Sequence, residues 1–215
     1  MTHTLHRLGK EESLRQDFVL TMMPSKGINV AGSAAKLKRL LDICMEQGAI
    51  KVGDARLGNQ YHQGSLDTML ANIEDQAVVQ AVFDDAEKVA QVLGAFKEID
   101  LGLSVVVSGL HDEVEKCCRN AGLKRHTVNQ SLGRWGRIDR LPSEEVLEIN
   151  TMCGHGMVAV GLIEEIAGRV RAGELTAEEG AEELFKPCMC GIFNPVRAAG
   201  LLKAMSERQV GPVEC

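Results

Sequence analysis

Short apolar runs alternate with amphipathic segments of about ten or more residues through the first 140 residues of the chain. An apolar run bounded by turn residues predicts a strand, whereas apolar residues three and four positions apart predict a helix. Strands separated by helices of this length are joined by crossover connections within one open sheet. The alternation therefore predicts an α/β fold before any single residue is considered.

The same patterns assign strands and helices to particular segments. We expect strands at 17–23, 49–54, 78–83 and 103–107, the last as a buried strand, and a further strand around Val128. We expect helices at 33–47, 66–73, 86–96 and 112–121. The predicted architecture is a compact open sheet with crossover helices, in a ferredoxin-like form with two split βαβ halves. A small doubly wound sheet is the alternative.

The chain changes character near residue 141, after which helical segments follow one another without strands. Thr176 and Glu179 have the spacing of a capping box, and Asn194-Pro195 combines a good N-cap with a residue suited to the first helical position. We therefore divide the chain into an α/β lobe at residues 1–140 and a helical, cysteine-bearing lobe at residues 141–215.

Three of the seven cysteines stand in two glycine-containing turns of the helical lobe. Cys153 lies in one turn, and Cys188 and Cys190 lie in the other, each shortly before a predicted helix. A helix start offers unpaired backbone N–H groups and the positive end of a dipole, which stabilise thiolates. Because the intervening helices can return the chain to its starting end, we expect the three thiols to converge.

Three thiolates from two turns suit a [4Fe–4S] cluster whose fourth iron lacks a cysteine ligand. Such an iron can bind a small ligand as a Lewis acid or pass electrons to it. His155 is close enough in sequence to complete the coordination or to act as an acid or base beside the cluster. The predicted metal ligands are Cys153, Cys188, Cys190 and His155, with Cys117 or Cys118 as other sources of a fourth ligand.

The same residue types leave other hypotheses open. A zinc site with three thiolates and one histidine uses them, although structural zinc sites commonly include a closely spaced cysteine pair. A protein that holds zinc, nickel or a transferable cluster for a partner would be an accessory or regulatory protein. Cys188 and Cys190 also suit a thiol oxidoreductase, and cysteine is a common core residue. The favoured hypothesis is an oxygen-sensitive, anaerobic iron–sulfur enzyme, either an oxidoreductase or a lyase.

A polar loop after the last helix of the α/β lobe supplies further candidates. Asn129, Gln130 and Arg134 are suited to fixing an anion or carboxylate, and Trp135 can wall a pocket. We predict His126 and Arg134, together with His155, as catalytic residues acting on a small-molecule substrate. Ordinary turn chemistry explains these polar loop residues equally well.

The composition of the chain excludes several classes of binding partner. A net charge of −6 argues against a nucleic-acid binder, and no glycine-rich nucleotide motif occurs. No apolar run approaches the roughly 20 residues that span a bilayer, and the first residues lack the apolar core of a secretory signal. We therefore expect a cytoplasmic protein without a membrane partner, with a redox partner protein as the alternative to a small substrate and with a homo-oligomer as a further possibility.

Overall fold

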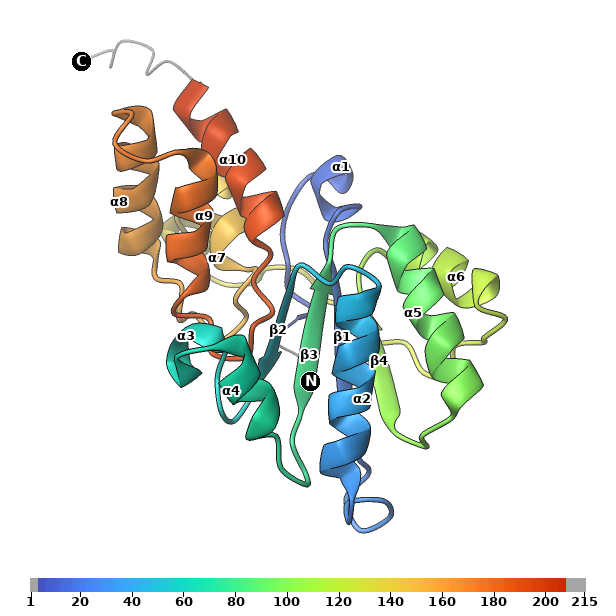
Figure 1. Ribbon diagram of the computed structural model, residues 1–215. Helices are drawn as coiled ribbons and strands as arrows, with labels where there is room; N and C mark the ends of the chain where they lie inside the picture. Colours follow the sequence, from blue (N-terminus) through green and yellow to red (C-terminus); the bar gives the residue numbers. More distant parts are fainter. Residues whose placement is uncertain (1–3, 208–215) are drawn as a thin grey trace, which may run out of the picture.

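The computed structural model of the protein describes residues 4–207. Its centre is a four-stranded antiparallel sheet in the order β2-β3-β1-β4 (Figure 1). With helices linking β1 to β2 and β3 to β4, this order is that of the ferredoxin-like split βαβ arrangement. The predicted open sheet with crossover helices is confirmed. The strands are β1 (Phe18–Met23), β2 (Lys51–Asp54), β3 (Val79–Phe83) and β4 (Ser104–Ser108).

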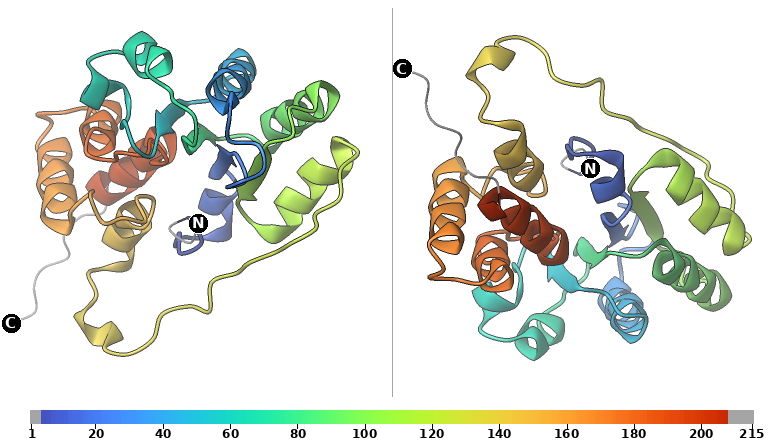
Figure 2. Two further views of the ribbon diagram at one scale, coloured as in Figure 1. Left: turned by 90° about the horizontal axis from the view of Figure 1, so that it is seen from below. Right: turned by 90° about the horizontal axis from the view of Figure 1, so that it is seen from above.

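The helices fall into two groups along the chain, before and after a long connection that is drawn in yellow-green in Figure 2. None of the helices in the described range is long and apolar enough to cross a membrane. The helices before the connection are α1 (Glu11–Leu14), α2 (Ser33–Glu46), α3 (Gln60–Gln63), α4 (Leu66–Ala71), α5 (Ala86–Ile99) and α6 (His111–Asn120). A 3-10 turn (Ile138–Arg140), α7 (Glu144–Asn150), α8 (Val160–Arg171), α9 (Ala177–Phe185) and α10 (Pro195–Glu207) complete the order.

Alternating residues of the central strands enter two different hydrophobic cores. Phe18, Leu20 and Met22 of β1 pack with residues of α2, α5 and α6 on one face of the sheet. Val19 of β1 and Val82 of β3, which stand opposite each other, pack on the other face with residues of α7 to α10. This is the period of two that a strand imposes on its side chains. The central strands β1 and β3 are therefore buried between the crossover helices and the C-terminal helices.

The C-terminal helices begin as the sequence indicates. The Thr176 side chain accepts a hydrogen bond from the Glu179 backbone N–H at 3.1 Å, and the Glu179 carboxylate accepts one from the Thr176 backbone N–H at 2.9 Å. Asn194 caps α10 by accepting from the Arg197 N–H at 3.0 Å, with Pro195 as the first helical residue. Both predicted helix starts are confirmed.

Two expectations at the other edge of the sheet are wrong. β4 is an edge strand rather than a buried one, and Val106 at its centre is 41% exposed. No fifth strand forms around Val128 within the described residues. The chain from 123 to 137 runs past β4 without making backbone hydrogen bonds to it. A run of β-branched residues occurs in edge strands as well as in central strands. Whether such a strand is buried depends on the segment that lies beside it in the fold.

A buried ionic network joins the N-terminal segment to the helical lobe. The fully buried carboxylate of Asp17, directly before β1, pairs with Arg7 and, at 2.8 Å, with Arg197 of α10. Arg197 also donates to the Leu8 carbonyl at 2.6 Å and to Ser13 at 2.8 Å. Burial lowers the pKa of Arg197 below its ordinary value, while the charge of Asp17 opposes that shift. Both guanidinium groups face Asp17, and Arg197 also lies 3.7 Å from the carboxylate of Glu148.

Asp17→Asn is expected to destabilise the protein strongly, because it removes the buried carboxylate that both guanidinium groups share. We expect the free energy of unfolding to fall by about 3–5 kcal/mol in urea denaturation. The matched control is Glu144→Gln, which removes a pair with Arg134 whose side chains are 67% and 40% exposed. That change should cost less than about 1 kcal/mol. Equal losses in the two variants would contradict the role assigned to Asp17.

Candidate functional site

The side chains of three cysteines, which come from two turns of the helical lobe, lie close together, as the sequence predicts. Cys153 lies just after α7, and Cys188 and Cys190 lie between α9 and α10. All three belong to the core that packs on the second face of the sheet, with 2%, 0% and 1% of their surface exposed. We call these three residues the cysteine centre.

The thiols of the cysteine centre are linked to one another. Hydrogen bonding with Cys188, together with burial, raises the pKa of Cys153 above its ordinary value. The bond with Cys153 lowers the pKa of Cys188, but bonding with Cys190 and burial outweigh it and raise that pKa to about 12. Hydrogen bonding from Cys188 lowers the pKa of Cys190 despite its burial. The three thiols therefore form one hydrogen-bonded set, from Cys153 through Cys188 to Cys190.

Backbone N–H groups also point at the three sulfur atoms. Each such bond lowers the pKa of its thiol, because it favours the thiolate over the thiol. The donors lie in the turns directly before α8 and α10, where the sequence predicts helix starts. They are Met157 and Val158 for Cys153, Phe193 for Cys188, and Ile192 with Cys190 itself for Cys190.

His155, the fourth metal ligand predicted from the sequence, lies next to the cysteine centre. Its Nδ1 lies 3.6 Å from Cys190 Sγ, and its side chain belongs to the exposed part of the turn at residues 154–157. The imidazole is thus the polar group that stands between a buried thiol and solvent. Sequence proximity to Cys153 indicated this residue, but its contact is with the cysteine of the other turn.

The second cysteine turn packs against β2 at backbone distance. A Cβ atom added to Gly53 would lie 2.6 Å from the Cys190 carbonyl oxygen, and one added to Gly191 would lie 2.7 Å from the Val52 carbonyl oxygen. Gly191 also has a φ of +70°, which favours glycine at this position. The absence of side chains at these two residues fixes the position of Cys190 on the sheet.

Asn59 holds the same turn from the loop after β2. Its buried side chain donates to the Cys188 carbonyl at 2.9 Å and to the Lys186 carbonyl at 3.2 Å. Its Oδ1 accepts from the Tyr61 N–H at 2.9 Å and lies 3.1 Å from His62 Nδ1. A single amide thus joins the loop at 55–64 to the carbonyl of a centre cysteine. The amide is structural, and its position close to Cys188 could not be read from its sequence neighbours.

Arg7 links the two cysteine turns. Its guanidinium donates to the Met152 carbonyl at 3.1 Å and to the Ile192 carbonyl, in addition to its ion pair with Asp17. Met152 adjoins Cys153 in the chain, and Ile192 lies two residues after Cys190. Sequence reasoning missed this residue because an arginine in a polar N-terminal segment is normally solvated.

The other predicted site residues lie elsewhere. His126 is exposed, bonds Thr127 at 2.7 Å, and lines a cavity beside β4, at the opposite edge of the sheet from β2. Arg134 is paired with Glu144 at 2.7 Å, outside that cavity lining. Cys117 is buried in the first core, where its thiol donates to the Ala86 carbonyl, and its neighbour Cys118 packs against that core. The structure therefore brings together the three predicted cysteines and His155 only.

Within residues 4–207, no three or more His, Cys, Asp or Glu side chains stand where they could hold a metal ion as placed. The thiols of the centre are hydrogen-bonded to one another, so a metal group would have to replace these thiol–thiol contacts. Comparison of the chain with protein-family models, with curated proteins and with solved structures gave no match.

Gly53→Ala is expected to push the cysteine turn away from β2. Since the added methyl group meets backbone rather than a mobile side chain, we expect the free energy of unfolding to fall by about 1–3 kcal/mol. Gly168→Ala in α8 is the control, because nothing lies within 4 Å of its Cβ position. Removing a helical glycine there should raise stability by roughly 0.5–1 kcal/mol. A neutral or stabilising Gly53→Ala would show that the close approach does not exist in solution.

Proposed function

We propose that the protein is an iron–sulfur enzyme in which Cys153, Cys188 and Cys190 hold a [4Fe–4S] cluster. The observation that carries the proposal is the meeting of three buried thiols from two turns, with backbone N–H groups directed at all three sulfur atoms. Hydrogen bonds to cysteine sulfur and burial are the two means by which a protein stabilises such a cluster and sets its potential.

The fourth iron is the reactive one in this proposal. With three cysteines in the centre, it has no thiolate and takes His155 or a small ligand. The exposed turn at 154–157 provides access, while the thiols themselves stay away from solvent. His155 then serves as the fourth ligand or as an acid or base next to a ligand bound at that iron. The resulting chemistry is Lewis-acid or redox catalysis on a small substrate.

A second candidate is a thiol oxidoreductase that uses Cys188 and Cys190. The contact between these two side chains is the observation that favours it. Their burial counts against it, because a redox dithiol must be reached by its partner, and only 0% and 1% of these residues is exposed. A zinc-holding accessory protein is the third candidate and uses the same donors.

The proposal predicts a coloured, iron-loaded protein under anaerobic purification. We expect about four irons and four sulfides per chain and absorption at about 400 nm. Cys153→Ala should abolish the colour and most of the iron. Cys44→Ala should keep both, since Cys44 is an equally buried thiol in the other core, where burial alone raises its pKa.

Iron and sulfide analysis with the ultraviolet–visible spectrum separates the three candidates. Colourless protein with one tightly bound zinc would reject the cluster in favour of the accessory role. Metal-free protein that is fully active, and loses activity when Cys188 or Cys190 is replaced, would establish the oxidoreductase. Circular dichroism of each variant confirms that loss of colour is not loss of fold.

A further inference from the structure

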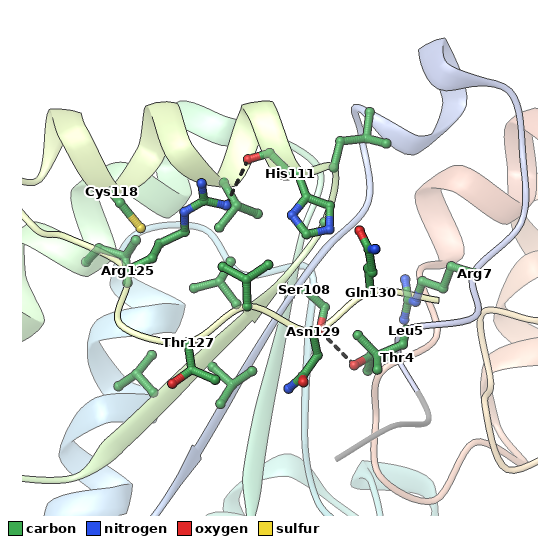
Figure 3. A pocket seen from close by; sticks show the side chains of 18 of the residues that line it. Thr4, Leu5, Arg7, Ser108, His111, Cys118, Arg125, Thr127, Asn129 and Gln130 are labelled. Carbon is green, nitrogen blue, oxygen red and sulfur yellow. Dashed lines mark hydrogen bonds between the residues drawn. The ribbon is translucent and has the colours of Figure 1, made fainter. Parts of the chain in front are cut away.

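A cavity of about 730 Å³ lies beside β4, between that edge strand and the extended segment at residues 124–131 (Figure 3). It exists because this segment follows the outer edge of β4 without a backbone hydrogen bond to it. In Figure 2 the same connection passes from α6 toward α7 apart from the other elements. The volume is that of an ordinary site for a small organic molecule.

The inner part of the cavity is apolar and incompletely covered. Its walls include Val105, Val107, Val114 and Leu123, and Val106 is 41% exposed beside them. Every residue of β4 retains some exposure, whereas β3 is fully buried. A ligand with an apolar body would remove this surface from water, which is the main source of favourable free energy for such a ligand.

The rim of the cavity is polar and positively charged. Lys124, Arg125, His111 and His126 line it, while the carboxylate of Asp17 is fully buried and already paired with two arginines. Arg125 is partly engaged, since it contacts Glu115 and donates to the His111 carbonyl at 3.4 Å. Lys124 is exposed. The charge that faces a ligand at this rim is therefore positive.

Two carboxamides complete the lining. Figure 3 shows Asn129 and Gln130 on the segment that covers the cavity, on the side toward Thr4, Arg7 and Ser108. Neither side chain makes a hydrogen bond to the rest of the described protein, whereas the Thr4 hydroxyl is bonded to Ser108 at 2.7 Å. Carboxamides placed in this way can donate hydrogen bonds to a polar group of a bound ligand.

We propose that this cavity binds an organic carboxylate with an apolar body. The apolar part covers β4 and the start of α6, and the carboxylate lies at the rim near Lys124. None of the three centre cysteines lines the cavity. The site is therefore distinct from the cysteine centre and does not depend on the proposed cluster.

Decanoate and its uncharged analogue decanamide are suitable probes. Titration of the full-length protein, followed by amide NMR shifts, should give saturable changes at residues 105–111 and 124–130 with decanoate, with a Kd below about 1 mM. Lys124→Glu should weaken decanoate binding at least about tenfold, because it replaces an attractive charge with a repulsive one. Lys203→Glu, an exposed lysine of α10 outside the cavity, makes the same charge change and should leave the Kd unchanged.

Three results would overturn the proposal. These are the absence of saturable shifts at those residues, equal binding of decanamide, or equal weakening by both lysine variants. Repeating the titration on Cys153→Ala separates this inference from the cluster, because binding should persist in that variant whether or not the cluster proposal holds.

Discussion

The carboxylate of Asp17 and the two guanidinium groups that face it hold the lobes of this protein together. One of these, Arg197, belongs to α10, and the other, Arg7, reaches the carbonyls beside both cysteine turns. A buried ionic group is costly unless its partners satisfy it, so the network favours only the arrangement in which all its members meet. The position of the cysteine turns follows from that condition.

The sheet supplies the other half of the constraint. The turn that carries Cys190 lies on β2 because Gly53 leaves no side chain in between, and Asn59 fastens the preceding carbonyl. The thiols are thus held between an arginine on one side and a strand backbone on the other. A site built on rigid elements in this way keeps its side chains in fixed positions.

Local patterns predicted most of the fold. Helix starts at Thr176 and Asn194 and the strand at 17–23 depend on residues next to one another in the chain, and these predictions are confirmed. The exposure of β4 and the missing strand at Val128 depend on which distant segment lies alongside, which local sequence does not record.

For the candidate site, too, local sequence predicted some residues and missed those whose contacts are distant in the chain. The clustering of the cysteines predicted which thiols meet, and His155 lies beside one of them, while their role as ligands stays a prediction. Arg7 and Asn59 were missed, since the carbonyls of the cysteine turns that they bind lie more than a hundred residues away and an isolated polar residue gives no signal of burial.

The central claim is that three cysteines and one open iron form the reactive centre. Mössbauer spectroscopy of protein reconstituted anaerobically with ⁵⁷Fe tests it most directly. The account predicts two kinds of iron in a ratio of about three to one. Four equivalent irons, or mononuclear iron alone, would contradict it.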